Sequence, residues 1–394
     1  MPQQDRHEAL RRELDADQLI KNAQEKAGLS DFGSMKFYPS LCKFLACAIH
    51  DIAFHEQGMG LFIADVERFL INRLRMQDDL KKHPEILEED VSDPIIVIGL
   101  ARSGTTKLQK MLSAPDNVHK VYFWRTWNPS RFPNAVPGKP DPRIAAADFS
   151  QLNSADNPII DAAHHMESQE VEEEWILYMH TFEEWALTQT LPIPSFFDWV
   201  MPRPSIGSFR HVKVMMQYLQ WQDGGKRDQP WIMKSVGYIA NLDSLLECYP
   251  DATLVHAHRD PRDTIPSFAK FLSGVWSLYA ENVDPHFVGA ETQRTWQIAV
   301  ERYLEARDRL KLDERILDVG YDQIRSDPMS IIRKIYARSP HRLTAEAEQK
   351  MADWHNTNEQ GRYGKHEYTL KELGLSDDGI DKAFAAYIHR FIQR

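Results

Sequence analysis

Residues 93–112, DPIIVIGLARSGTTKLQKML, decide the fold class of this chain. The apolar run at residues 95–98 predicts a buried strand, and the residues from Thr105 onward predict a helix. Gly99 and Gly104 have the spacing of a P-loop, G-x-x-x-x-G-K-[ST], in which backbone N–H groups and a helix N-terminus hold an anion. Thr105 stands where that motif has its lysine. The stretch therefore predicts a phosphate loop that lacks one cation.

The same loop carries polar side chains suited to an oxyanion. Arg102 supplies a positive charge, and Ser103, Thr105 and Thr106 supply hydroxyl groups on either side of Gly104. Two glycines at this spacing also occur in tight strand-to-helix turns that bind nothing. The spacing alone leaves both interpretations open.

Composition restricts the partners of the chain. Its 394 residues are 42% hydrophobic and 27% charged, which is the balance of an ordinary globular protein. The formal net charge of −11 at pH 7 disfavours nucleic acid or an anionic membrane as the main partner, because both need clustered positive charge. The sequence shows no signal peptide and no apolar run of about 18 residues. We therefore expect a cytoplasmic protein without a membrane span, in which Cys42, Cys47 and Cys248 are core thiols.

Residues 1–92 are predicted to form helices that pack on the rest of the chain. A capping box begins at Asp15, and apolar residues then recur at helical spacing within residues 41–52 and 62–74. No Gly/Ser-rich linker follows these helices. We therefore interpret them as a helical lead-in docked on a main domain of residues 93–394.

From residue 93 onward the pattern alternates strand, turn and helix, as a parallel α/β sheet requires. Strands are predicted at residues 95–99, 231–233, 253–258 and 315–319, with helices beginning near residues 105, 238, 261 and 328. The predicted fold class is α/β: a P-loop-type, three-layer fold with a central parallel sheet flanked by helices, plus the N-terminal helical segment.

A second polar cluster lies in LVHAHRDPRDTIPS, residues 254–267. The predicted strand ends at Arg259, and Ser267 lies on the helix that follows. An arginine and a hydroxyl at the carboxyl end of a parallel strand suit one phosphate group. A surface ion-pair cluster is the alternative. The tripeptide HRD also begins the kinase catalytic loop H-R-D-x-x-x-x-N, but Ile265 stands in place of its asparagine.

Together the two segments resemble the donor-binding motifs of sulfotransferases that use 3′-phosphoadenosine 5′-phosphosulfate (PAPS), in particular the bacterial family with PRSGTT-like and HRDP-like signatures. The similarity extends to WIMKS at 231–235, LDVGYDQIRSDP at 317–328 and NEQGRYGKHEYTL at 358–370. The resemblance implies that the first loop holds the 5′-phosphosulfate and that Arg259 and Ser267 hold the 3′-phosphate. It also implies that no metal is needed.

The resemblance gives the missing loop lysine a physical explanation. A kinase neutralises a triphosphate with that lysine and Mg²⁺, whereas a phosphosulfate carries less charge, so Arg102 and the loop N–H groups could suffice. In related enzymes a lysine at the position of Lys234 faces the bridging oxygen between phosphate and sulfate, where it would stabilise the leaving group. A lysine that extends from a strand end into water is the alternative. Tyr238 stands where the family often has a histidine.

The general base is implied only by spacing. Family relatives place a histidine and then two carboxylates at the spacing of His164, Glu172 and Glu173. Acidic residues in the first turn of a helix also favour the helix dipole and simply face water, so this segment has an alternative structural interpretation. His256 and His258 could suggest a metal, but the sequence shows no obvious third ligand.

Two later segments are expected to complete the donor pocket. Tyr321 resembles the tyrosine that lies near the adenine in related enzymes. Arg362 and Lys365 lie in a glycine-punctuated loop that could close over the 3′-phosphate. A basic surface turn is an equal alternative for that loop.

We therefore expect a PAPS-dependent sulfotransferase that moves a sulfuryl group to a hydroxyl by in-line displacement and releases adenosine 3′,5′-bisphosphate. The insertion at residues 115–230 is expected to bind a small-molecule or lipid acceptor, and Arg125 could indicate an acidic one. The aromatic residues of the insertion fit either a hydrophobic pocket or ordinary core: Trp124, Trp127, Trp175, Trp185, Phe196, Phe197 and Trp199. A kinase with a degenerate P-loop and a catalytically inactive nucleotide-binding protein are the alternatives.

Overall fold

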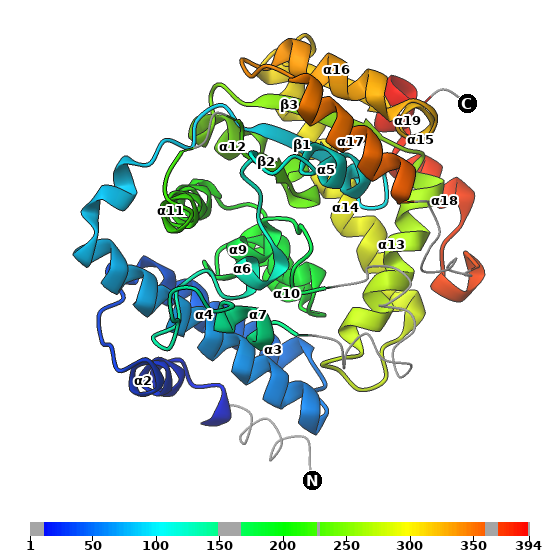
Figure 1. The fold of residues 1–394 in the computed structure, drawn as a ribbon. Coiled ribbons are helices and arrows are strands. Elements are labelled where there is room, and N and C mark those ends of the chain that lie inside the picture. The colour runs from blue at the N-terminus through cyan, green and yellow to red at the C-terminus, as the bar shows by residue number, and fades with distance from the viewer. Residues whose placement is uncertain (1–11, 149–166, 227–228, 359–368, 393–394) are drawn as a thin grey trace.

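A parallel β-sheet of four short strands forms the centre of the protein (Figure 1). The computed structural model describes residues 12–148, 167–226, 229–358 and 369–392. The strands are β1 (Ile95–Gly99), β2 (Ile232–Lys234), β3 (Thr253–His258) and β4 (Ile316–Gly320), in the order β2-β1-β3-β4. Every pairing between them is parallel. The predicted α/β class with a central parallel sheet is therefore confirmed.

Helices cover both faces of this sheet, which gives the predicted three layers (Figure 1). On one face Ile95 and Val97 pack with α5 (Thr105–Leu112), α16 (Pro328–Arg338) and α17 (Ala345–Thr357). On the other face Ile96 and Ile98 join the core that contains α12 (Leu242–Cys248) and α14 (Pro285–Arg309). All five residues of β1 are buried. Burial on both faces explains the unbroken aliphatic sequence of this strand.

Within the described residues, three helices of more than ten residues precede the sheet, as the sequence predicted. They are α2 (Ala16–Ala27), α3 (Tyr38–Asp51) and α4 (Glu56–Lys82), with the short 3-10 helices η1 (Met35–Phe37) and η2 (Pro84–Glu88). Asp15 caps α2, because its side chain accepts a hydrogen bond from the Gln18 backbone N–H at 2.9 Å. No helix among the described residues is long and apolar enough to cross a membrane.

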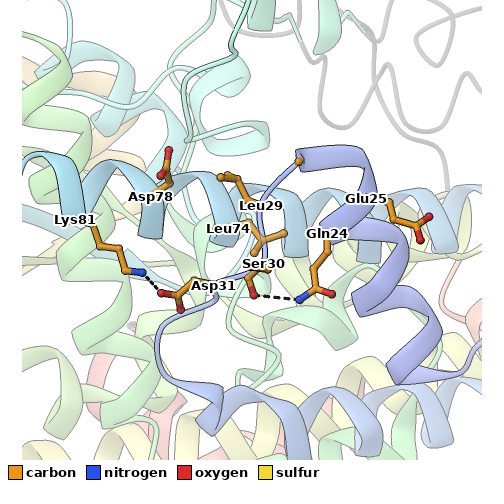
Figure 2. A pocket seen from close by; sticks show the side chains of 9 residues that line it. Gln24, Glu25, Leu29, Ser30, Asp31, Leu74, Asp78 and Lys81 are labelled. Atoms are coloured by element: carbon orange, nitrogen blue, oxygen red, sulfur yellow. Dashed lines mark hydrogen bonds and ion pairs between the residues drawn. The ribbon is translucent and has the colours of Figure 1, made fainter.

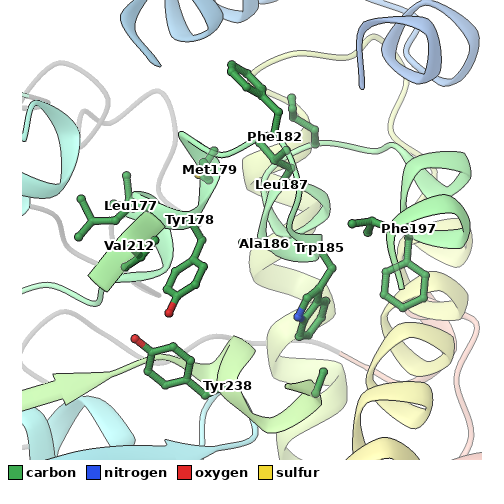
Figure 3. Packing of buried hydrophobic residues seen from close by; sticks show 14 of the residues in the cluster. Leu177, Tyr178, Met179, Phe182, Trp185, Ala186, Leu187, Phe197, Val212 and Tyr238 are labelled. Atoms are coloured by element: carbon green, nitrogen blue, oxygen red, sulfur yellow. The ribbon is translucent and has the colours of Figure 1, made fainter. Parts of the chain in front are cut away.

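Several described helices of the segment between α5 and β2 lie between α4 and the sheet (Figure 1). The elements of this segment are α6 (Phe123–Trp127), α7 (Pro142–Ala146), α9 (Trp175–Met179), η3 (Trp185–Gln189), α10 (Pro194–Val200) and α11 (Ile206–Gln222). Many of its aromatic side chains form core, part of which Figure 3 shows. Phe182 packs on Phe44 and Phe69 of the N-terminal helices, with ring centroids 5.9 and 5.8 Å away. This aromatic core joins the insertion to the lead-in.

Two details near predicted helices differ from the prediction. Around residue 238 the chain forms a 3-10 turn, η4 (Val236–Ala240), because the Ser235 side chain caps this turn by accepting from the Gly237 N–H at 3.1 Å. After β4, an unpredicted short helix α15 (Tyr321–Ser326) precedes α16. The remaining elements are α13 (Pro261–Trp276), η5 (Lys371–Leu373), α18 (Asp377–Ala383) and α19 (Ala385–Phe391). The three cysteines, all within the described residues, are free thiols, and Cys47 and Cys248 are buried.

The beginning of α4 packs directly on the segment that follows α13. The His55 N–H donates to the Tyr279 carbonyl at 3.3 Å, and the Glu281 N–H donates to the Ala53 carbonyl at 2.7 Å. A Cβ on Gly58 would lie 2.2 Å from the Tyr279 carbonyl oxygen. Glycine at position 58 therefore permits this close approach.

We predict that Gly58→Ala destabilises the protein by about 1–3 kcal/mol, because the new methyl group forces the two backbones apart. Gly60→Ala is the matched control on the same helix, since a Cβ there meets no atom within 4 Å. The control should be neutral or stabilising by up to about 1 kcal/mol, as expected for alanine in a helix. Urea unfolding measures both values. Equal effects of the two substitutions would contradict the close contact.

Candidate active site

The loop after β1 is shaped by two glycines. Gly99 and Gly104 have φ values of 153° and 93°, and Arg102 between them has φ 68°. A Cβ on Gly99 would lie 2.6 Å from the Ala257 carbonyl oxygen of β3, and one on Gly104 would lie 3.1 Å from the Tyr321 ring. The loop therefore lies tightly against β3 and α15, and α5 begins at its end. A loop that leads into a helix N-terminus in this way can direct backbone N–H groups at an anion.

The structure brings the two predicted donor motifs into contact. Arg102 donates through Nε to the Ser267 hydroxyl oxygen at 3.3 Å, and Arg259 donates through Nη1 to the Arg102 carbonyl at 3.0 Å. The Arg259 guanidinium also lies over the Tyr321 ring, 4.1 Å from its centroid. The Ser103 hydroxyl donates to the Leu100 carbonyl at 2.7 Å, so it stabilises the loop itself. Two arginines and an aromatic ring are thus held at one edge of the sheet.

A cavity of about 180 Å³ begins at this loop. Its polar wall contains residues from all the predicted catalytic segments that the structure describes: Arg102, Thr105, Thr106, Glu172, Glu173 and Lys234. Most of the other walls are apolar and come from the insertion, from α13 and from the segment after it: Phe123, Trp127, Trp175, Ile176, Met179, Trp185, Ala186, Phe268, Phe271, Val275 and Leu278. The cavity therefore combines charged groups with a largely apolar wall.

Lys234 and Glu173 form a buried ion pair in the wall of this cavity. The Lys234 ammonium lies 2.8 Å from Glu173 Oε1, and the two side chains are only 2% and 10% exposed. Lys234 therefore does not extend into water. Glu172 is also buried, and its Oε1 accepts a hydrogen bond from the Glu173 N–H at 2.9 Å. Glu172 and Glu173 therefore do not simply face water, unlike Glu167 of the same acidic segment, which is exposed.

Glu174, which belongs to the same acidic run, is a further buried carboxyl. Its Oε2 accepts a hydrogen bond from the Lys234 backbone N–H at 2.8 Å, and the Tyr238 hydroxyl lies 3.4 Å from the same oxygen. Burial raises the pKa of Glu174 to about 8. In Figure 3 the hydroxyl groups of Tyr178 and Tyr238 point toward each other. Glu174, buried and in its protonated form, therefore holds the backbone of Lys234 through this hydrogen bond.

A cluster of two buried histidines and a more exposed aspartate lies next to Arg259. The ligand-type atoms of His256, His258 and Asp318 lie within 4.8 Å of one another, so Asp318 is the third metal-type group that the sequence did not reveal. His258 Nε2 lies 2.8 Å from Asp318 Oδ1, and Arg307 donates to both oxygens of Asp318 at 2.7 and 2.6 Å. Although burial opposes it, hydrogen bonds from Arg307 and His258 lower the pKa of Asp318 to about 2. With Arg307 supplying the positive charge, the cluster fits a hydrogen-bonded network better than a metal site.

Some predicted residues lie elsewhere. The interpretation of Arg125 as a guide to an acidic acceptor is wrong, because this side chain is buried and donates to Asp223 at 2.9 and 2.8 Å and to the Leu219 carbonyl. His164, Arg362 and Lys365 lie outside the described residues. Both interpretations of the aromatic residues hold in part. Trp127, Trp175 and Trp185 line the cavity, and Trp124, Phe196, Phe197 and Trp199 pack in the core.

A second hollow lies far from these residues, between α2 and α4 (Figure 2). Asp31 and Lys81 form an ion pair across it, and Gln24 donates to the Ser30 carbonyl at 3.0 Å. The hollow contains none of the predicted site residues. Its polar groups satisfy one another, so we place the candidate site at the sheet.

Comparisons with known proteins bear on the family and the fold of the chain. The model of a family described as "Sulfotransferase family" matches residues 94–339. The crystal structure of sulfotransferase STF1 from Mycobacterium tuberculosis H37Rv is similar, with 26% identity, a TM-score of 0.80, and coverage of 94% of this chain and 98% of that one. Sulfotransferase STF9 from Mycobacterium avium also has 26% identity, with a TM-score of 0.84 and coverage of 96% and 97%. A search of curated proteins found no match.

We predict that Glu174→Gln stabilises the protein increasingly as the pH rises. With its pKa raised to about 8, Glu174 stays protonated in the folded state, whereas the unfolded chain ionises above its ordinary value of 4.5. Wild-type stability should therefore be lost between pH 4.5 and 8, by up to about 1.4 kcal/mol per pH unit, and the glutamine variant should escape this loss.

Urea unfolding at several pH values between 5 and 8 measures the difference between the two proteins. Glu305→Gln, at an exposed position of α14, is the control and should change stability by less than about 0.5 kcal/mol. A difference between wild type and Glu174→Gln that stays constant with pH would show that this carboxyl is not protonated in the folded state.

Proposed function

This chain belongs to the sulfotransferase family, and we propose that it transfers a sulfuryl group from PAPS to a hydroxyl of a hydrophobic small molecule or lipid. The observation that carries the proposal is the buried ion pair of Lys234 and Glu173, in the wall of a cavity that begins at a lysine-free phosphate loop. A cation and a carboxylate side by side are the groups that sulfuryl transfer needs, one for the leaving oxygen and one for the acceptor proton.

In this proposal the donor binds along the carboxyl edge of the sheet. The loop of residues 102–106 would hold the 5′-phosphosulfate through its N–H groups, the Arg102 guanidinium and the threonine hydroxyls. Arg259 and Ser267 would hold the 3′-phosphate, with Tyr321 beside the nucleoside. The contacts among Arg102, Arg259, Ser267 and Tyr321 support this role, because they gather the charge without a bound anion. Arg362 and Lys365 stay candidates for the same phosphate.

The reaction would be an in-line displacement at sulfur. The acceptor oxygen forms a bond to sulfur while the bond from sulfur to the bridging oxygen of PAPS breaks. The electron pair of that bond stays with adenosine 3′,5′-bisphosphate, where the Lys234 ammonium stabilises it. The acceptor proton passes to a carboxylate, for which Glu173 is our first choice and Glu172 the second, with His164 a further candidate. No proton or charge is left without a partner.

The ion pair also suggests how donor binding prepares the base. Without a donor, Lys234 neutralises Glu173 at 2.8 Å. A phosphosulfate would compete for the same ammonium. Because the carboxylate then loses its partner inside a buried site, it becomes a better proton acceptor when the donor is in place. In the enzyme without a donor, the ion pair with Lys234 would therefore keep Glu173 from accepting a proton from water.

We also propose the division of labour along the chain. Residues 93–394 would form the PAPS-binding domain, with the segment at 115–230 as the acceptor-binding insertion and residues 1–92 as a docked lead-in. The apolar side chains that this insertion contributes to the cavity support a hydrophobic acceptor. Thr105 in place of the loop lysine argues against the kinase alternative.

We predict that adenosine 3′,5′-bisphosphate binds with a Kd of about 1 μM or tighter in excess EDTA, and that ATP with Mg²⁺ binds far more weakly. Titration calorimetry measures both. Arg259→Gln should weaken bisphosphate binding at least about tenfold, because a charged hydrogen bond to phosphate is lost. Arg262→Gln is the matched control, since Arg262 lies three residues away and pairs with Asp381, whereas Arg259 contacts the loop and the Tyr321 ring. Binding of ATP alone, and only with Mg²⁺, would overturn the proposal.

We predict that Lys234→Met lowers kcat by about 10²–10³-fold, because the leaving oxygen loses its cation, and that Glu173→Gln lowers it by about 10²-fold. Transfer of ³⁵S from labelled PAPS to a panel of alcohols, phenols and extracted lipids measures the rates. Bisphosphate binding by each variant controls for folding. Bisphosphate binding without transfer to any acceptor by the wild type would favour an inactive nucleotide-binding protein.

A further inference from the structure

One part of the cavity wall comes from neither the donor loop nor the insertion. Asp65 lies on α4, in the N-terminal helical segment, and Tyr279 lies after α13. Both side chains line the cavity, together with Val275 of α13 and Leu278, which follows that helix. α4 precedes residues 94–339, over which the family matches. The N-terminal segment therefore contributes a polar group to an otherwise apolar part of the chamber.

Asp65 is held in place by two hydrogen bonds. Arg68 donates to Oδ1 at 2.9 Å, and the Tyr279 hydroxyl donates to Oδ2 at 2.9 Å. Arg68 in turn donates to the Trp127 carbonyl at 2.6 Å and lies over the Trp127 ring, 3.3 Å from its centroid. The Asp65 and Arg68 side chains are 17% and 12% exposed. The carboxylate is thus rigid and largely buried, and each of its oxygens can accept another hydrogen bond.

The burial of Asp65 and Arg68 lowers the stability of the fold. Two charges in a largely buried site lose most of their hydration, and well-packed apolar side chains of similar volume often stabilise such a place better. The neighbouring face of α4 is apolar, with Phe62, Val66 and Phe69 buried. A polar group in an apolar pocket typically fixes the orientation of a ligand. The placement of Asp65 on the cavity therefore points to recognition.

The position of α4 indicates which part of the wall it supplies. Figure 1 shows the insertion helices α6, α9 and α10 between α4 and the sheet. Lys234 ends β2 of that sheet, and Glu173 is paired with it. Asp65 therefore lines the cavity from a helix that lies on the other side of these insertion helices from the sheet. Because Arg68 neutralises Asp65, this part of the wall suits a neutral hydrogen-bond donor better than a cation.

We propose that Asp65 recognises a second hydroxyl of the acceptor, so that the acceptor is an apolar molecule with one hydroxyl at each end. This inference rests on the proposed function, and it makes α4 a specificity-determining element of the same site. One hydroxyl would face Glu173 and Lys234 for transfer. The other would donate to the Asp65 carboxylate, and the apolar body between them would lie along the tryptophans and α13.

Binding of matched alcohol pairs tests this inference. Linear 1-alkanols and α,ω-alkanediols from six to twelve carbons are titrated into the full chain saturated with adenosine 3′,5′-bisphosphate, with tryptophan fluorescence as the readout. Without a partner, the second hydroxyl would weaken binding, because its burial costs hydration. With Asp65 as its partner, the diol should bind at least about tenfold more tightly than the 1-alkanol at one or more chain lengths.

The double variant D65L/R68M removes both charges together, so that neither is left buried without a partner. It should lose the diol preference and keep its affinity for 1-alkanols and for the bisphosphate. Asp65→Asn, which keeps the shape, should reduce the preference in part. The double variant D78L/K82M is the control, because it removes another ion pair of α4 and neither residue lines the cavity. It should keep the full preference.

The outcomes separate this inference from the proposed function. Equal or weaker binding of the diol at every length, or a preference that survives in D65L/R68M, would overturn the role of Asp65. Binding of the bisphosphate without binding of any alcohol or diol would also overturn it, and would leave the donor site standing. Failure to bind the bisphosphate would instead overturn the proposed function.

Discussion

Parallel pairing of β1 with β2 and β3 is the constraint on which the whole site depends. Gly99 at the end of β1 lies opposite Ala257 of β3, and Val97 lies opposite Lys234 of β2. Because parallel strands end at the same edge of a sheet, the loop of residues 99–106, Lys234 and Arg259 meet there although they are far apart in the sequence. A slip of one residue in either pairing would turn Lys234 or the Arg259 corner away from the loop.

The buried positive charge of this site comes from a different strand than the lysine of an ordinary P-loop. The loop has a threonine at the lysine position, and the nearest buried ammonium comes from the neighbouring strand, where it is paired with Glu173. Such a pair loses hydration on burial, and removal of one partner would leave the other charge unpaired. The ion pair therefore keeps the site neutral, and in the proposed mechanism the anionic donor replaces Glu173 as the partner of Lys234. Glu174 accepts a hydrogen bond from the Lys234 backbone N–H and so holds this end of β2 in position.

Local patterns in the sequence were enough to predict the sheet, the loop and the helix starts at Thr105, Pro261 and Pro328, since these depend on neighbouring residues. The contact between Lys234 and Glu173 could not be derived, because it joins residues about 60 positions apart across an insertion without a repeat or a fixed spacing. The partners of Arg125 and Asp318 escaped prediction for the same reason. Asp65 carried no local signal, as it is one acid on a long amphipathic helix.

In the proposed mechanism, the Lys234 ammonium leaves its ion pair with Glu173 and binds the donor instead. The most direct measurement is a crystal structure of the full chain with adenosine 3′,5′-bisphosphate, compared with the chain alone. We expect the 5′-phosphate to accept hydrogen bonds from the N–H groups of residues 102–106 and the 3′-phosphate to bind Arg259. The Lys234 ammonium should have moved from Glu173 toward the 5′-phosphate. A bound nucleotide at the loop with the ion pair of Lys234 and Glu173 still closed would contradict this mechanism.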